Sequence, residues 1–144
     1  MTSTGAAAQE LGVDAAAVRA CHDSAQGWDV TPDCIGAAAN LCQETPGGST
    51  TVGIGACLAA EIAVWDEILN EEYQARRAEF SASAAELADA LRDAQRAWIA
   101  FRDADCDLRY TLFQGGSIRS IVGANCRLSK TAQRAIELRD IGDL

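Results

Sequence analysis

Residues 91–106, with the sequence LRDAQRAWIAFRDADC, decide the fold that this chain is expected to adopt. The stretch joins strong helix formers such as leucine, arginine and alanine to two large aromatic side chains and ends in a cysteine. On a 3.6-residue period its apolar positions share one face: Leu91, Ala94, Trp98 and Phe101. Three further residues follow along the flank of that face: Gln95, Arg102 and Cys106. The stretch therefore predicts a central helix that buries Leu91, Trp98 and Phe101.

Two more long helices are predicted around this one. Residues 55–80 carry a sustained apolar stripe with a residue every three or four positions: Leu58, Ile62, Trp65, Leu69, Tyr73 and Arg76. Ser83 and Glu86 form a capping-box pattern for a central helix over residues 84–113, which Gly115 and Gly116 end. Ser117 is the expected cap of a last helix over residues 118–139. Its apolar face comprises Ile121, Val122, Leu128, Ala132, Ala135 and Leu138.

The N-terminal third is predicted to be less regular. Residues 1–12 are small and polar and form a flexible N-terminus. A short helix is expected within residues 13–24 and another over 33–42, where Thr31 caps and Pro32 takes the first position. Residues 45–55, TPGGSTTVGIG, contain four glycines and one proline, which predicts a loop.

No segment alternates between apolar and polar residues, so no sheet is expected. The predicted fold is an all-α, disulfide-stapled antiparallel bundle of three long helices with one or two short N-terminal helices. Residues 13–144 are expected to form a single helical domain, because 144 residues suffice to bury one substantial core.

The charge of the chain is strongly negative. Twelve basic residues stand against 21 acidic ones, which gives a net charge of −9. This balance argues against nucleic acid or an anionic membrane surface as a partner and is compatible with a basic protein or peptide.

The six cysteines predict an oxidising compartment. None belongs to a C-x-x-C pair and the only histidine is His22, so zinc-binding spacing is absent. An even number of cysteines without metal spacing favours disulfides, and therefore a secreted or periplasmic protein. The first 20 residues lack the features of a signal peptide, so we expect a form from which a leader has been removed. No stretch has the length of a transmembrane segment. The residues alone leave fifteen full cysteine pairings open.

The sequence gives no sign of catalysis. It contains no G-x-S-x-G elbow, no H-E-x-x-H motif and no P-loop, and its one histidine has no recognisable nucleophile partner. We therefore expect a protein that is not an enzyme and that has neither a cofactor nor a metal.

Polar residues accompany the apolar stripes of two helices. Asp66, Asn70 and Tyr73 recur at i, i+4 and i+7, and Gln95 and Arg102 lie on the opposing helix. One interpretation is a structural network in which Arg102 meets Asp66, because buried polar groups must be paired. The other is a ligand pocket that these residues line. Trp28, in a predicted loop, is expected either to be an exposed contact residue or to pack over a disulfide.

Several of these residues also resemble the sequence signature of a known protein family. Cys57-Leu58, Trp65-Asp66, Leu69-Asn70 and Tyr73, followed by the run from Gln95 to Cys106, resemble the signature of the LprI-type lysozyme-inhibitor N-terminal family. Downstream residues fit it as well: Gly115, Gly116, Cys126, Thr131, Arg134 and Leu138. The resemblance covers about residues 42–138. It implies the disulfides Cys42–Cys57 and Cys106–Cys126, which leaves Cys21–Cys34 as a third pair.

The resemblance implies a function as well. The expected function is that of a secreted or periplasmic, non-enzymatic binding protein that inhibits a cationic lysozyme. By composition, the element that enters the enzyme's cleft is a flexible loop, either within residues 45–53 (Gly47, Gly48, Ser49 and Thr50) or at 115–117. The alternative is a structural or interaction module of the cell envelope without lysozyme activity. A third option is a small-molecule binder with a pocket between Asp66, Tyr73 and Arg102.

Overall fold

The computed structural model describes residues 10–143. Its helices in chain order are α1 (Ala15–Ser24), α2 (Ala37–Gln43), α3 (Thr51–Ser83), α4 (Ala85–Leu112) and α5 (Ile118–Asp140). The described residues contain no strand, so the predicted all-α class is confirmed. Residues 1–9 of the N-terminus predicted to be flexible lie outside the described residues. Among the helices described, none combines the length and the apolar character needed to cross a membrane.

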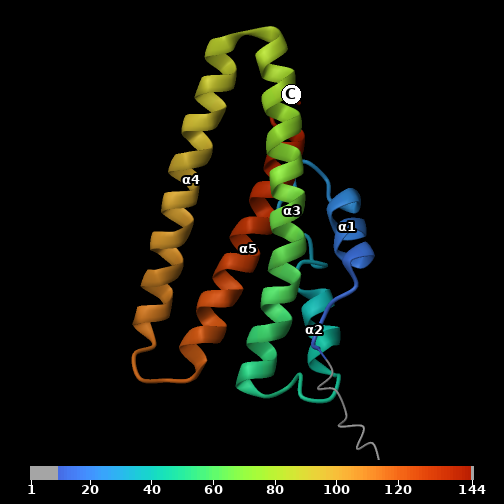
Figure 1. The fold of residues 1–144 in the computed structure, drawn as a ribbon, viewed down its shortest axis with the longest axis vertical. Coiled ribbons are helices and arrows are strands. Elements are labelled where there is room, and N and C mark those ends of the chain that lie inside the picture. Colours follow the sequence, from blue (N-terminus) through green and yellow to red (C-terminus); the bar gives the residue numbers. More distant parts are fainter. Residues whose placement is uncertain (1–9, 144) are drawn as a thin grey trace, which may run out of the picture.

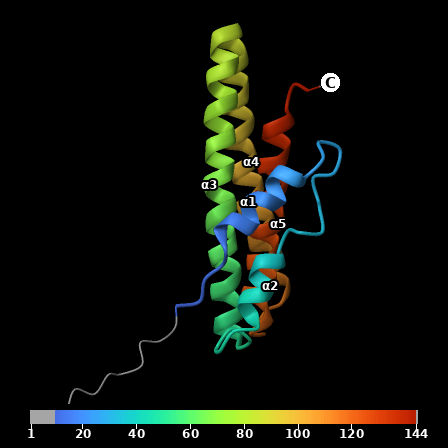
Figure 2. The ribbon, with the colours of Figure 1, turned by 90° about the vertical axis from the view of Figure 1, so that its right-hand side faces the viewer.

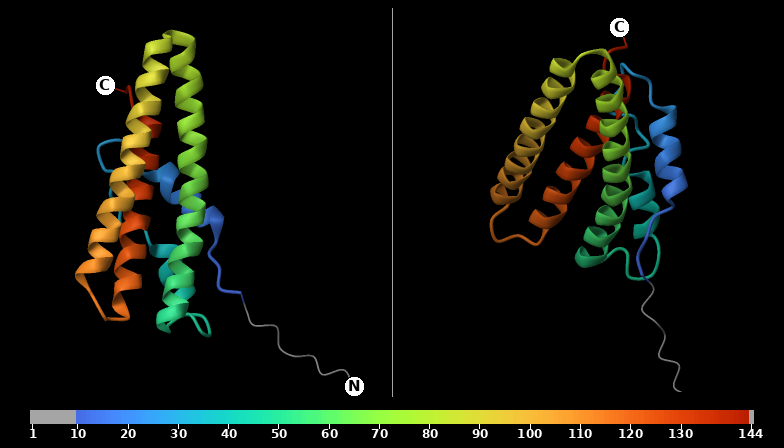
Figure 3. Two further views of the ribbon diagram at one scale, coloured as in Figure 1. Left: turned by 60° about the vertical axis from the view of Figure 1, so that its left-hand side comes forward. Right: turned by 45° about the horizontal axis from the view of Figure 1, so that its top comes forward.

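The three long helices form the body of a bundle, and the two short helices cover one side of α3 (Figure 1). α3 and α4 form an antiparallel hairpin, and α5 returns between them, so that α3 and α5 run in the same direction. α1 and α2 pack on α3 on the side away from α4, and α1 also contacts α5 (Figure 2). The α2–α3 loop and the α4–α5 turn therefore lie at the same end of the bundle (Figure 3).

The core lies mainly along the contact between α3 and α5. Trp65 and Leu69 of α3 are buried there, as expected from the apolar stripe. Ala132 and Ala135 of α5 are fully buried, and their small side chains allow the two helices to approach closely. α4 adds Leu91 to this core, which again agrees with the periodicity.

The buried face of α4 differs from the predicted one. Leu91 is buried and Trp98 is half-buried against the core, but Phe101 is 58% exposed. Gln95 and Cys106, which were placed on the flank, are both buried. The prediction of Phe101 as a core residue was therefore wrong. The disulfide from Cys106 to α5 turns the flank of the predicted stripe inward, and Phe101 is left at the exposed edge of the α4–α5 contact, with the Nζ of Lys130 4.8 Å from its ring.

Three disulfides cross-link the chain: Cys21–Cys34, Cys42–Cys57 and Cys106–Cys126. These are the pairs that the family resemblance implies. The first ties α1 to the turn before α2, the second ties α2 to α3, and the third ties α4 to α5. Their sequence separations are 13, 15 and 20 residues, which correspond to about 3 kcal/mol each in the chain-entropy account.

α3 begins earlier than predicted, because the second half of the glycine-rich stretch is helical. Thr50 is the N-cap, and its Oγ1 accepts a hydrogen bond from the Gly53 amide at 2.9 Å. The prediction of a loop through Gly55 was therefore wrong for residues 51–55. A threonine cap satisfies the first turn in spite of its two glycines.

α2 begins later than predicted. The amide of Thr31 donates to Asp29 Oδ1 at 3.0 Å, so Thr31 takes part in a local turn instead of capping a helix. Gly36 adopts a left-handed conformation, with φ 92°, directly before α2. Cys34 consequently precedes the helix rather than forming its first turn.

Neither serine that was predicted to cap a long helix does so. Ser83 is the last residue of α3, and Ala84 separates α3 from α4 in an extended conformation. Ser117 precedes α5 without a side-chain hydrogen bond to it. Gly115 has the left-handed φ of 76° expected of a glycine that follows a helix. The link at Ala84 makes α3 and α4 a tight hairpin and fixes their register.

Candidate functional site

A groove between α3 and α4 brings together all five residues that were predicted to form a polar site. In an antiparallel hairpin linked at Ala84, residues equally distant from the link lie opposite each other, so Asp66 faces Arg102 and Tyr73 faces Gln95. The groove has a volume of about 280 Å³. Its lining residues are Asp66, Leu69, Asn70, Tyr73 and Gln74 from α3, and Arg92, Gln95, Arg96, Ile99 and Arg102 from α4.

The groove residues do not form the direct network that was one of the two interpretations. Arg102 donates from Nε to Asp103 on its own helix at 3.0 Å, and Gln95 accepts from Arg134 of α5 at 2.9 Å. Within residues 10–143, no side-chain hydrogen bond joins α3 to α4. The predicted pairing of Arg102 with Asp66 was therefore wrong. The residues do line one groove, and the interpretation that they bind a ligand stays a prediction.

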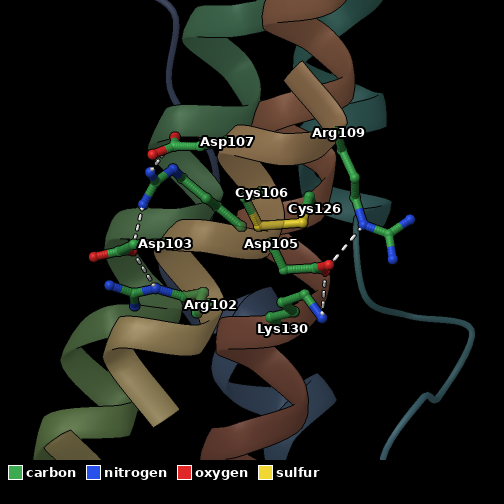
Figure 4. Close-up of a disulfide and its surroundings, with 9 residues drawn as sticks. Arg102, Asp103, Asp105, Cys106, Asp107, Arg109, Cys126 and Lys130 are labelled. Atoms are coloured by element: carbon green, nitrogen blue, oxygen red, sulfur yellow. Dashed lines mark hydrogen bonds and ion pairs between the residues drawn. A yellow bond between two sulfur atoms is a disulfide. The ribbon is translucent and has the colours of Figure 1, made fainter. Parts of the chain in front are cut away.

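An ion-pair network surrounds the disulfide between α4 and α5 (Figure 4). On one side of it Asp103 accepts a hydrogen bond from Arg127 of α5 at 2.7 Å. On the other side Asp105 accepts from Arg109 at 3.0 Å and lies 3.1 Å from the Nζ of Lys130. The network holds the C-terminal half of α4 against α5.

The same contacts keep these two aspartates ionised. Hydrogen bonds from Arg109 and Lys130 lower the pKa of Asp105. For Asp103, burial by itself raises the pKa, but the hydrogen bonds and charges of Arg102 and Arg127 outweigh it and the net shift is downward. Carboxylates that are held in ion pairs with low pKa values have a structural role and are poor candidates for acid–base chemistry.

The loop over residues 44–50, which was expected to contact a partner, consists of turns. Gly48 is buried, and Thr50 Oγ1 donates to the carbonyl of Gly47 at 3.2 Å. α3 packs so closely on the loop that a Cβ at Gly53 would lie 1.9 Å from the Gly47 carbonyl oxygen. The α2–α3 disulfide closes the base of the loop. Ser49 remains exposed at its surface.

Glu61 is a buried acid that the sequence analysis did not single out. It is 1% exposed, and its carboxylate accepts hydrogen bonds from the amide of Gly36 at 2.8 Å, the amide of Ala39 at 2.9 Å and Nε1 of Trp65 at 3.0 Å. The side chain thus caps α2 from across the helix interface. The sequence does contain a signal for this role. Glu61 lies four residues before Trp65 on the apolar stripe of α3, and a charged residue at such a position has to be buried and paired.

Comparison with known proteins now identifies the family. The family model described as lysozyme inhibitor LprI matches residues 42–138, about two-thirds of the chain. This chain belongs to the LprI lysozyme inhibitor family. It is also similar to an uncharacterized protein of Rhizobium meliloti (strain 1021), with 31% identity over 121 residues that cover 75% of this chain and 87% of that protein. No solved structure matches it.

The part of the chain that matches LprI begins inside α2 and includes all three long helices. α1 and the Cys21–Cys34 disulfide precede it. The residues that carry the resemblance on α3 and α4 include Asp66, Asn70 and Tyr73, which line the groove. Other residues of the signature, such as Cys57, Trp65 and Cys106, are buried in the core and in the disulfides.

The charge of this LprI protein is unevenly distributed. Residues 1–75 contain one basic and eleven acidic residues, a net charge of −10, whereas residues 76–144 contain eleven basic and ten acidic residues, a net charge of +1. In the structure the first group comprises α1, α2 and most of α3, which we call the acidic side. α4 and α5 form the other, nearly neutral side (Figure 1).

The remaining candidates from the sequence occupy separate places. His22 is buried, with its Nε2 3.5 Å from Glu72 and its ring edge-on to Trp65. Trp28 is 85% exposed, as expected if it is a contact residue. Among the described residues, no group of three or more histidine, cysteine or acidic side chains is arranged to hold a metal ion.

Proposed function

We propose that this LprI family member is a secreted or periplasmic, non-enzymatic binding protein that inhibits a cationic lysozyme. The observation that carries the proposal is the family match over residues 42–138. The three disulfides support an extracytoplasmic location, because disulfides persist in oxidising compartments and are rare in the cytosol.

The acidic side supports a cationic partner. The net charge of −10 on residues 10–75 lies on α1, on α3 and on the segments that precede or connect the helices, and it attracts a basic enzyme and orients its approach toward that side. Such steering acts between exposed charges, so it weakens as salt shortens the Debye length from about 10 Å at 0.1 M to about 3 Å at 1 M. Inhibition should accordingly be weaker at high salt.

The 44–50 loop is the element best suited to enter the enzyme's cleft. It lies at the end of the acidic side, and it comprises Gly47, Gly48, Ser49 and Thr50, of which Thr50 hydrogen-bonds to the Gly47 carbonyl and to the Gly53 amide. A preorganised loop loses little conformational entropy on binding. The 115–117 turn at the same end lies between Arg109 and Arg119, so its surroundings are less favourable for a cationic enzyme.

The proposal is tested by the lysis of bacterial cell walls. The turbidity of a cell-wall suspension is followed with c-type lysozyme alone and with a stoichiometric excess of the oxidised protein. We expect inhibition that decreases with added salt. Absence of inhibition at every ratio, with the protein folded and its thiols oxidised, would refute the inhibitor function.

Two matched variants test the loop. Ser49 and Ser117 are both exposed loop serines at the same end of the bundle, and each is replaced by arginine. Ser49→Arg places bulk and a like charge against a cationic enzyme, so we expect inhibition to weaken about tenfold or more. Ser117→Arg should leave it nearly unchanged. Equal inhibition by the two variants would exclude the 44–50 loop as the inhibitory element.

A second candidate function is an envelope interaction module without lysozyme activity. It is favoured by exposed apolar side chains around the α4–α5 turn: Leu108, Leu112, Phe113 and Ile118. They line a hollow of about 480 Å³. Clustered apolar groups of this kind favour a protein–protein contact. If lysozyme is not inhibited, Leu112→Asp should abolish the binding of the partner captured by the wild-type protein.

A further inference from the structure

The α3 wall of the groove carries polar groups that the protein itself does not use. Asp66 and Asn70 are exposed and Tyr73 is half-buried. None of their side chains forms a hydrogen bond or ion pair with another residue in the part of the chain that the structure describes. Together they offer a carboxylate, a carboxamide and a phenol hydroxyl within two turns of one helix.

The α4 wall carries the complementary donors. Arg96 is exposed and makes no ion pair with any residue between 10 and 143. Arg102 uses only its Nε–H, toward Asp103, so four of its five N–H donors remain available. Arginine donors in this planar arrangement match the two oxygens of a carboxylate.

The composition of the two walls restricts the ligand. A simple anion would be held by Arg96 and Arg102 but would leave Asn70 and Tyr73 unused and would be repelled by Asp66. A simple cation would be repelled by the arginines, and a neutral sugar would leave the charge of Arg96 unpaired. A molecule with one carboxylate and several hydroxyl groups pairs with both walls, because hydroxyls donate to Asp66 and exchange hydrogen bonds with Asn70 and Tyr73.

We propose that the α3–α4 groove binds a small hydroxylated carboxylate, that is, an acidic sugar. The volume of about 280 Å³ lies just below the range of about 300–1,000 Å³ typical of sites for drug-sized ligands, so it suits a single sugar ring. A ligand of about a dozen heavy atoms at ordinary ligand efficiency binds with a dissociation constant on the order of 1 mM.

This site is independent of the proposed lysozyme contact. The 44–50 loop lies at the far end of α3, whereas the groove lies nearer the α3–α4 link (Figure 1). Loss of lysozyme inhibition and loss of sugar binding can therefore be observed separately.

The test is a titration of the oxidised, isotope-labelled protein with glucuronate, followed by heteronuclear NMR. We expect saturable shifts of backbone amides in residues 66–74 and 92–102 and of the side-chain signals of Arg96 and Arg102. Glucose, acetate, glycine and inorganic phosphate are the control ligands, and each should produce much weaker shifts at the same concentrations. The proposal is refuted if glucuronate shifts no groove signal, or if a control ligand binds as tightly.

Three variants assign the site. Arg96→Ala should weaken glucuronate binding about tenfold, because it removes a charge-assisted hydrogen-bond donor, and Asn70→Ala should weaken it to a smaller extent. Both residues are exposed, so the amide spectrum should remain that of a folded protein. Arg119→Ala, an exposed arginine outside the groove, is the matched control and should bind as the wild type does. Wild-type affinity in Arg96→Ala would overturn the assignment.

Discussion

Replacement of Glu61 tests most directly what holds the N-terminal part of the chain to the bundle. Its carboxylate is the acceptor for three donors, of which the Ala39 amide and the Trp65 indole are fully buried. A buried donor left without a partner costs about 1–3 kcal/mol, so the loss of the acceptor for two buried donors costs about 2–6 kcal/mol. We therefore expect Glu61→Ala to lower the free energy of unfolding by about 2–6 kcal/mol. That is a large part of the total of about 5–15 kcal/mol for a domain.

The isosteric replacement should be milder. In Glu61→Gln the amide oxygen still accepts a hydrogen bond, but the NH₂ group faces an N–H donor, so we expect a loss of about 1–2 kcal/mol. Glu67→Ala is the control, since Glu67 lies on the same helix with its side chain 70% exposed and should change stability by less than about 0.5 kcal/mol.

The assay for these variants is guanidinium chloride unfolding of the oxidised proteins at neutral pH. Tryptophan fluorescence and far-ultraviolet circular dichroism should give coincident transitions, which supports a two-state analysis. A Glu61→Ala protein as stable as Glu67→Ala would refute the view that Glu61 connects α2 to α3.

Three further outcomes are expected. Gly53→Ala should destabilise the protein by about 1–3 kcal/mol, because its Cβ meets the neighbouring loop, whereas Gly55→Ala, with no atom near its Cβ, should stabilise it by about 0.5–1 kcal/mol in the same unfolding assay. Replacement of both Cys106 and Cys126 by alanine should remove about 3 kcal/mol of unfolding free energy, measured by thermal and chemical denaturation. Because basic neighbours lower the pKa of Asp105, its contribution to stability is present above about pH 4 and is lost as the pH falls through that lowered pKa. The unfolding midpoint should therefore fall less steeply below about pH 4 in Asp105→Asn than in the wild type.

The long helices were predictable because their signals are local. The stripe from Leu58 to Tyr73 specifies α3, and the small and glycine residues after Leu112 specify where α4 ends. The helix starts were harder to predict, because they depend on groups distant in sequence. α2 begins where Glu61, 25 residues after Gly36, supplies the acceptor for its first turn. No local propensity contains that information.

The polar residues of the groove were also predictable as a set, but their pairing was not. Periodicity places Asp66 and Tyr73 on one side of α3, and the Ala84 link places Arg102 and Gln95 opposite them. The pairing depends on how far apart the helices are at that depth. α5 enters between α3 and α4, and Arg134 of α5 takes the hydrogen bond of Gln95 (Figure 1). The groove is left with unpaired polar groups on both walls.

The inward face of α4 is fixed by its disulfide more strongly than by hydrophobic periodicity. Cys106 is bonded to α5, and Trp98, eight positions before it, lies on the same side of α4, with the guanidinium of Arg134 of α5 5.9 Å from its ring. Phe101, five positions before Cys106, lies about 140° around the helix at about 100° per residue, which takes it out of the core to the exposed edge of the contact with α5. Arg102 pairs with the adjacent Asp103, which also accepts a hydrogen bond from Arg127 of α5, and Arg102 does not pair with Asp66. Once the pairing of Cys106 is assumed, the sequence therefore predicts the exposed phenylalanine.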